Sequence, residues 1–196
     1  MIGTGPYDSL REYVEAIEEH GKLIRINEID QDAYELTGFI YKLLDKYGWL
    51  GAPAIIVERV KIDGEWMQGP ILINQYGMGG HEALVVGVPL DEIDPEDHIL
   101  NYKKSLEKML NEVPIEPKKT KEVKSSDAPS KEVILKGDEI DILSFPFIQT
   151  NPADNGRFIN TGNLITIDPD GGRNVGTYRM QIKGPRKIGI SPERNQ

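Results

Sequence analysis

The chain has 196 residues, of which 38% are hydrophobic and 28% are charged, and this globular composition allows one large or two small domains. Its formal net charge of −9 at pH 7 argues against nucleic acid as a partner, because neutralising phosphates requires clustered lysine and arginine. The sequence has no cysteine, which excludes disulfides and cysteine-based metal sites and agrees with a reducing cytoplasm, and it has no apolar run long enough to span a membrane.

Helical and extended patterns alternate along the first 113 residues. Ser9 and Glu12 form a capping box, and the apolar stripe that follows predicts a helix ending at Gly21. Asp63-Gly64 is typical of a hairpin turn. The further elements that we expect are strands at 23–29, 54–57 and 71–74 and helices at 33–47 and 94–111. These patterns predict an N-terminal α/β domain over residues 1–113, in an α/β (α+β) fold class.

The histidines and a glycine-rich loop give little indication of a site. His20, His81 and His98 show no ligand spacing, so we expect surface or capping residues. The glycines from Gly77 to Gly80 lack the lysine and the serine or threonine of a phosphate-binding loop. They predict a loop before a helix that begins near His81.

A change in composition separates the two halves of the chain. Residues 114–130 are rich in Lys, Glu, Ser and Pro, which is typical of a linker. Residues 132–136 and 140–148 predict the first short strands of a second domain, which covers residues 131–196 and has a barrel-like sheet. We expect this sheet to be incomplete, with edges that another polypeptide segment covers.

The last forty residues contain two alternating strands joined by a turn. The strands are expected at 158–167 and 174–183, and the turn at 168–172. On the second strand, Asn174 and Arg179 fall on opposite sides. On the first strand, strict alternation places Phe158, Asn160, Gly162, Leu164 and Thr166 on one face and Ile159, Thr161, Asn163, Ile165 and Ile167 on the other.

Two polar side chains of the second strand suit particular ligands. The planar fork of Arg179 can give two parallel charge-assisted hydrogen bonds to a carboxylate. The amide oxygen of Asn174 is a hard ligand of the kind that manganese and magnesium prefer. Taken alone, Arg179 also fits a solvated strand position, and Asn174 also fits a hairpin position beside Gly171 and Gly172.

Three strings in this region are specific: GRFINT at 156–161, NVGTYRMQ at 174–181 and IGI at 188–190. Together they resemble the signature of UbiD-type decarboxylases, which use prenylated FMN. The string SLREYVEAIEEHGKLIRI at 9–26 is similar to the start of the same family. The resemblance spans the chain, with little contribution from residues 118–136. It implies that the second domain is the opening part of a split β-barrel that binds the flavin.

The resemblance also implies roles for individual residues. The oxygen of Asn174 would bind a divalent metal, manganese or magnesium, that also holds the flavin phosphate, and potassium is considered as a second cation. Thr161 and Val175 would lie against the cofactor. Arg179 would lie beside the cofactor and the substrate carboxylate, paired with glutamates of a later acidic motif. Gln196 matches a cofactor-binding glutamine that directly precedes the metal-binding histidine, which would be residue 197.

The implied function is the N-terminal part of a decarboxylase or carboxylase that acts on an aromatic or α,β-unsaturated acid. Losing CO2 from an sp² carbon leaves a carbanion that needs an organic electron sink, which a cofactor supplies. Because the remaining site residues would follow residue 196, we expect the chain alone to be inactive. It would be an N-terminal fragment, one subunit of a split enzyme or a cleavage product. The alternative is a non-catalytic flavin-binding or assembly subunit with the split-barrel fold.

The expected partners follow from the same resemblance. They are a small carboxylic acid as substrate, the remaining C-terminal part of the enzyme or a complementary subunit, and a flavin prenyltransferase that supplies the cofactor. We also expect a homo-oligomer, and neither nucleic acid nor a membrane as partner.

Overall fold

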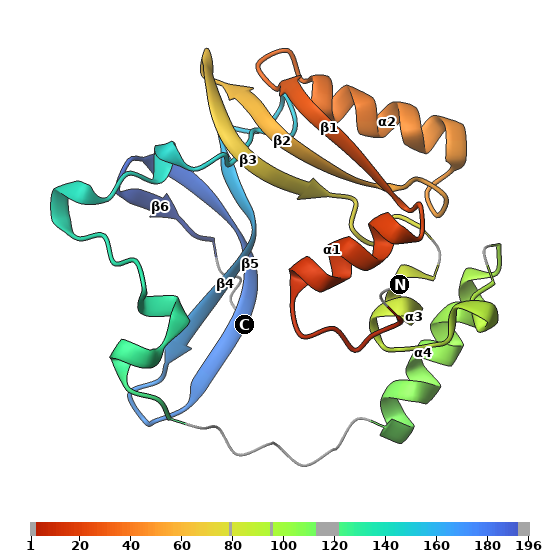
Figure 1. Cartoon of the computed structure of the whole chain (residues 1–196). Helices are drawn as coiled ribbons and strands as arrows, with labels where there is room; N and C mark the ends of the chain where they lie inside the picture. The colour runs from red at the N-terminus through yellow and green to blue at the C-terminus, as the bar shows by residue number, and fades with distance from the viewer. Residues whose placement is uncertain (1–2, 79, 95, 113–121, 192–196) are drawn as a thin grey trace. The chain divides into compact units, whose positions relative to one another are not determined.

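The computed structural model describes residues 3–78, 80–94, 96–112 and 122–191 (Figure 1). The chain divides into two compact units. Unit 1 comprises Met1–Ile29, Gly38–Arg59 and Gly69–Thr120, and unit 2 comprises Asp30–Thr37, Val60–Gln68 and Lys121–Gln196. None of the helices in the described part of the chain is long and apolar enough to cross a membrane. The boundaries 1–113, 114–130 and 131–196 remain a prediction, and residues 113–121 lie outside the described residues.

The first helix, α1 (Leu10–Glu19), has the predicted N-terminal cap. The hydroxyl of Ser9 accepts from the amide of Glu12 at 3.2 Å, and the carboxylate of Glu12 accepts from the amide of Asp8 at 2.9 Å. These bonds satisfy two of the amides that a helix start leaves without a partner. The helix ends before Gly21, whose φ of +66° favours glycine.

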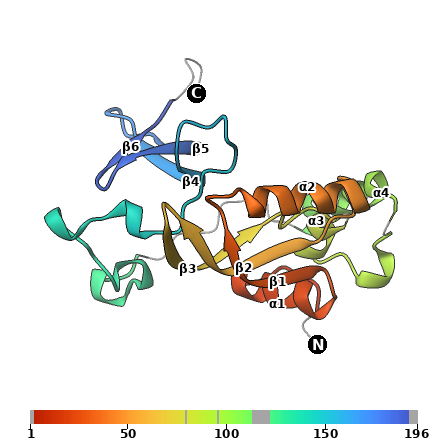
Figure 2. The same cartoon turned by 90° about the horizontal axis from the view of Figure 1, so that it is seen from above.

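A three-stranded sheet in the order β1-β2-β3 follows, with strands at Leu23–Asp30, Ala54–Ile62 and Glu65–Ile73. Asp63 and Gly64 form the predicted turn, both with positive φ. Figure 2 shows α1 and α2 (Glu35–Tyr47) on opposite faces of this sheet. One buried cluster of unit 1 contains Tyr13, Ile17, Ala54 and Leu84, packed against Tyr7, Leu23, Leu72, Val85 and Ile93.

His81 is a core residue, which corrects the expectation of a surface or capping position. It begins α3 (His81–Val85), which precedes the single turn Leu90–Glu92 and α4 (His98–Glu112). Only 3% of His81 is exposed, and its Nδ1 lies 3.0 Å from the carbonyl oxygen of Gln75, which also accepts from the hydroxyl of Tyr13. Burial lowers the pKa of His81 to about 4. Its imidazole is therefore neutral at pH 7.

The strands predicted at 132–136 and 140–148 are wrong. The structure has short 3₁₀ turns in this part of unit 2, at Ser125–Asp127, Pro129–Lys131, Gly137–Glu139 and Ile142–Ser144. The carboxylate of Asp141 accepts from the amide of Leu143 at 2.9 Å and so caps the last turn. The apolar run Val133–Leu135 is exposed, so it packs as neither a strand nor a core segment.

The predicted hairpin near the end of the chain is confirmed. Strands β4 (Phe158–Ile167), β5 (Arg173–Gly184) and β6 (Lys187–Gly189) form an antiparallel sheet in the order β4-β5-β6. In the turn, the carboxylate of Asp168 accepts from the amide of Asp170 at 2.8 Å, and Gly171 has a φ of +96°. The mixture of helices and sheets agrees with the predicted fold class, while the split barrel remains an expectation.

The pairing of β4 with β5 contains a bulge that strict alternation does not predict. Ile159 pairs with Met180 and Gly162 pairs with Tyr178, so Asn160 and Thr161 together oppose the single residue Arg179. The extra residue reverses the alternation of faces, so residues before and after the bulge no longer follow one odd–even pattern. From the register, Phe158, Asn160, Thr161, Asn163, Ile165 and Ile167 share the face of Arg179, which corrects the predicted face of Phe158 and Asn160.

Candidate functional site

Arg179 is the centre of a hydrogen-bonded network in unit 2. Its Nη1 and Nη2 atoms donate to the two carboxylate oxygens of Asp154 at 3.0 and 2.5 Å. Its Nε donates to the side-chain oxygen of Asn160 at 2.9 Å, and Nη2 also donates to the hydroxyl of Thr150 at 3.2 Å. The bulge in β4 makes this arrangement possible, because it places Asn160 beside the guanidinium.

The guanidinium is also stacked and partly open to solvent. Its Cζ lies 4.1 Å from the centroid of the Phe158 ring, a cation–π distance. The side chain of Arg179 is 44% exposed, whereas that of Asp154 is 16% exposed. Hydrogen bonding from Arg179 lowers the pKa of Asp154, so this carboxylate is ionised at neutral pH.

The loop that carries Asp154 is held by hydrogen bonds from its own side chains and from residues near the start of the chain. Gln149 donates from its side-chain amide to the backbone oxygen of Asp154 at 2.8 Å. The buried Gln31 donates to the backbone oxygen of Gln149 at 2.9 Å, and the hydroxyl of Thr37 donates to the backbone oxygen of Thr150 at 2.7 Å. Asp154 is therefore fixed before any ligand binds.

Arg157 stabilises the same region from a buried position. It is 7% exposed and donates to the carbonyl oxygens of Phe147, Leu143 and Phe145 at 2.7, 3.0 and 2.6 Å. Its Nη1 also lies 3.3 Å from the carboxylate of Asp63. A guanidinium suits this place because it offers five donors in a fixed fork to a segment without regular backbone pairing.

One face of the β4–β5 hairpin carries most of the predicted site residues. Thr161, Val175 and Arg179 share it. Val175 pairs with Ile165 across the strands, and these side chains are 59% and 62% exposed. Ile167, 70% exposed, continues the apolar part towards the turn. The face thus carries an open apolar patch and, beyond the hydrogen-bonded pair Thr177–Asn163, the cation of Arg179, which suits a flat, anionic, largely apolar molecule.

Asn174 lies on the other face of the hairpin, where it pairs with Thr166. With Asp168 it lines a pocket of about 510 Å³ at the turn. Asn174 and Arg179 lie five positions apart along the strand, a rise of roughly 16 Å. The structure therefore brings Thr161 and Arg179 together but keeps Asn174 apart from them, and one ligand touching all three must be large.

The described residues offer a metal only part of a ligand set. They contain no group of three His, Cys, Asp or Glu residues that could hold an ion. Asn174 and Asp168 do supply two side chains with hard oxygens to one pocket, so the donor chemistry fits a manganese or magnesium ion that takes further ligands from elsewhere. Gln196, predicted to bind the cofactor, lies outside the described residues.

The network around Arg179 is not indicated by the sequence pattern. Asp154, Thr150 and Asn160 were not predicted as site residues. Asp154 lies in the segment Asn151–Asn155, which by composition is an ordinary turn. Its hydrogen-bond partner, Arg179, is 25 residues further along the sequence. Only the motif GRFINT, which contains both Arg157 and Asn160, marked this neighbourhood.

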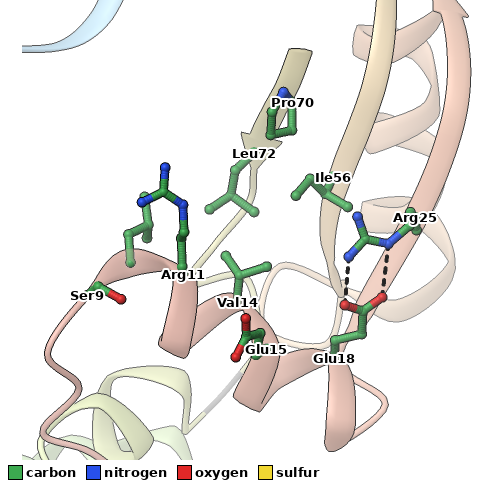
Figure 3. Close-up of a pocket in the computed structure, with 10 residues that line it drawn as sticks. Ser9, Arg11, Val14, Glu15, Glu18, Arg25, Ile56, Pro70 and Leu72 are labelled. Atoms are coloured by element: carbon green, nitrogen blue, oxygen red, sulfur yellow. Dashed lines mark hydrogen bonds and ion pairs between the residues drawn. The ribbon is translucent and has the colours of Figure 1, made fainter.

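A second pocket lies in unit 1 and is lined by none of the predicted site residues. It has a volume of about 570 Å³. Figure 3 shows Val14, Leu72 and Ile56 facing one another, with the Glu18–Arg25 ion pair at one end. The pocket is an open apolar groove with a charged rim, in which Glu18 and Arg25 pair with each other.

Comparison with known proteins finds a family model for residues 121–196 and relatives of lower identity along nearly the whole chain. Residues 121–196 match the family model described as the 3-octaprenyl-4-hydroxybenzoate carboxy-lyase Rift-related domain, UbiD. A phenolic acid decarboxylase of Escherichia coli O157:H7 is 26% identical over 195 residues, which cover 95% of this chain and 37% of that protein. The phenolic acid decarboxylase of Sedimentibacter hydroxybenzoicus is 27% identical over 191 residues, covering 94% and 36%. The chain thus spans a little over a third of the length of these relatives.

Comparison with solved structures also finds that this chain is similar to part of larger enzymes. The open form of the vanillic acid decarboxylase of Sedimentibacter hydroxybenzoicus superposes with a TM-score of 0.73 at 27% identity, over 95% of this chain and 38% of that one. An evolved dimeric form of the UbiD-class enzyme HmfF from Pelotomaculum thermopropionicum, in complex with prFMN, superposes with a TM-score of 0.68 at 27% identity, over 96% and 39%. These comparisons confirm the resemblance predicted from the motifs.

Proposed function

Because this chain is related to the N-terminal portion of the UbiD-type enzymes, we propose that it supplies that portion of a prenylated-FMN-dependent carboxy-lyase. The complete enzyme would remove CO2 from, or add it to, an aromatic or α,β-unsaturated carboxylic acid. The observation that carries the proposal is the open hairpin face, on which Val175 and Ile165 lead to the cation of Arg179. A planar aromatic ring fits the apolar part and an anionic group fits the cation.

The residues of this chain would bind and orient. Thr161 and Val175 would lie against the flavin ring, and Arg179 beside the substrate carboxylate. Asn174 would give its oxygen to the metal, manganese or magnesium, near the flavin phosphate. When bound, the prenylated flavin supplies the electron sink that decarboxylation at an sp² carbon requires. Potassium as a second cation and Gln196 as a cofactor contact belong to the same proposal.

The chain would need a further polypeptide to act. Asn174 and Asp168 are too few ligands for a tightly held divalent ion, since hard cations take six or more oxygens. The chain also matches only 37% of its relatives' length. We therefore include a complementing C-terminal part or subunit as a partner, with a flavin prenyltransferase as the cofactor's supplier and a homo-oligomer as the assembled form.

A non-catalytic flavin-binding or assembly subunit is the second candidate. It is favoured by the pairing of Arg179 with Asp154, which neutralises the cation that would meet the substrate. Under this alternative the flavin would bind but no acid would lose CO2.

One experiment separates the two candidates. The chain is co-expressed with a flavin prenyltransferase and with a segment that supplies the rest of the UbiD-type fold; we call the product the complemented enzyme. CO2 release is then measured from a panel of aromatic and α,β-unsaturated acids. The proposal expects release from at least one acid, and Arg179→Lys should reduce turnover by about a hundredfold or more while flavin stays bound, because Lys lacks the planar fork. Flavin binding without CO2 release from any acid would favour the second candidate.

A further inference from the structure

We propose that Asp154 is a positioning residue, which holds the guanidinium of Arg179 so that a single N–H of Nη1 is left for the ligand carboxylate. The inference rests on the proposed function, because it concerns the way in which Arg179 meets a carboxylate. It corrects the simpler picture in which the whole fork of Arg179 faces the substrate.

The donor count of Arg179 leads to this inference. A guanidinium has five N–H donors. Nε is used by Asn160, one N–H of Nη1 and one of Nη2 are used by Asp154, and the second N–H of Nη2 is used by Thr150. One N–H of Nη1 is left without a partner among the described residues. A ligand carboxylate can therefore accept one hydrogen bond from Arg179, and not two in parallel.

The direction of this N–H is set by the scaffold. The Asp154 carboxylate accepts from the hydroxyl of Thr150 at 3.1 Å, and its backbone amide donates to the oxygen of Asn151 at 2.9 Å. A bidentate pair with a fixed carboxylate prevents rotation of the guanidinium about its Nε–Cζ bond. The Phe158 ring covers one face of the plane at 4.1 Å, so a ligand approaches along the open edge or over the other face.

Asp154 also reduces the net positive charge at Arg179. Its carboxylate is ionised and offsets the cation, so a substrate anion is attracted less strongly than by a bare arginine. Asp154 therefore improves the orientation of Arg179 but lowers the affinity of the site for the substrate in its ground state. Removing the Asp154 charge should free the fork, so a carboxylate would bind tighter but in the wrong plane.

Asp154 is thus expected to have opposite effects on the order of Arg179 and on its affinity for a carboxylate. Both effects can be tested on the chain alone, with benzoate as the probe. The Nε–H signal of Arg179, assigned with Arg179→Lys, is followed by ¹H–¹⁵N NMR during a benzoate titration. We expect a sharp signal that exchanges slowly with water in the wild type, and in Asp154→Asn a broader signal with severalfold tighter benzoate binding. Asp138→Asn is the matched control: it removes one carboxylate of the same unit that pairs with an arginine, Arg186, but is 97% exposed. An Arg179 signal and a benzoate affinity unchanged in Asp154→Asn would overturn the inference.

The complemented enzyme gives the second readout. In Asp154→Asn we expect KM to fall severalfold while kcat falls at least tenfold, with flavin content unchanged, and Asp154→Glu should recover part of kcat because it restores the carboxylate. A general loosening of the fold would instead raise KM and lose flavin, and that result would contradict a positioning role. If the wild type releases no CO2, the proposed function fails, and the NMR titration alone decides whether Asp154 fixes Arg179.

Discussion

The hydroxyl of Thr37, in the first turn of α2, donates to the backbone oxygen of Thr150 at 2.7 Å, across 113 residues of sequence. The same hydroxyl accepts from the side-chain amide of Gln31 at 3.1 Å. Thr150 in turn contacts both Asp154 and Arg179. An early segment of the chain therefore holds the loop that orients the arginine of the hairpin, and both belong to unit 2.

The first prediction concerns this link. Thr37→Val should lower the free energy of unfolding by about 1–2 kcal/mol, because it leaves the Thr150 oxygen and one N–H of Gln31 without their partner in a partly buried place. It should also broaden the Arg179 Nε–H signal. Urea unfolding and NMR measure the two effects. Thr166→Val, at an exposed position of β4, is the control and should change stability by less than about 0.5 kcal/mol. Equal effects of the two substitutions would contradict the link.

Arg157 carries the second prediction. Arg157→Met keeps much of the side-chain volume but removes the donors to Phe147, Leu143 and Phe145. We expect a loss of about 3 kcal/mol or more, since three partly buried carbonyl oxygens lose their partner. Arg186→Met, which breaks an exposed ion pair, should cost about 1 kcal/mol or less. Thermal unfolding of both variants would show whether the buried arginine dominates.

The sequence predicted regular elements well and the site incompletely, for physical reasons. Capping by Ser9 and the Asp63-Gly64 turn depend on neighbouring residues, so local pattern was sufficient. The apolar composition of Val133–Leu135 predicts a strand, but a strand also requires a partner, which composition does not reveal.

The bulge and the pairing of Arg179 depend on distant contacts. Asn160 and Thr161 are both polar and both fit an ordinary exposed strand, so their residue types do not mark the extra residue. Asp154 is a site residue only because β5 brings Arg179 to it. The absence of ligand spacing predicts a surface or capping position for His81, and only its contacts with Tyr13 and Gln75 place it in the core.

The third prediction tests the open hairpin face. Val175→Lys should leave the stability of the chain nearly unchanged, because Val175 is 59% exposed, but should abolish flavin binding in the complemented enzyme. A long cation at this position would occupy the apolar surface on which the flavin ring is proposed to lie. Val133→Lys places the same charge on an exposed apolar residue of the same unit, outside the hairpin, and should leave flavin absorbance intact. Normal flavin content in Val175→Lys would exclude this face as the ring's site.

The fourth prediction follows from the buried His81. Its pKa is lowered to about 4, mainly by burial, against about 6.5 in the unfolded chain. Below pH 6.5 the unfolded chain takes up a proton that the folded chain refuses until about pH 4. The stability that the neutral imidazole contributes is therefore complete above pH 6.5 and is lost as the pH falls towards 4. It amounts to a few kcal/mol at most.

Urea unfolding at a series of pH values measures this loss. His81→Gln should flatten the dependence of unfolding free energy on pH between 6.5 and 4, since the new side chain does not titrate. Val88→Ala destabilises the same unit without removing a titrating group and should keep the wild-type slope. A wild-type slope in His81→Gln would assign the acid sensitivity to other groups.

The last prediction concerns Asn174 and the metal. A single neutral amide cannot hold a hard cation against water, and Asp168 adds only one carboxylate. The 196-residue chain should therefore bind manganese weakly in a calorimetric titration. In the complemented enzyme, manganese and flavin should bind together, and Asn174→Ala should weaken both, because each ligand helps to hold the other. Asn111→Ala, at an exposed position of α4, is the matched control and should leave manganese affinity unchanged. Tight, stoichiometric binding to the chain alone would show that the metal site is built without a complementing segment, and that Asn174 has a different role from the one proposed.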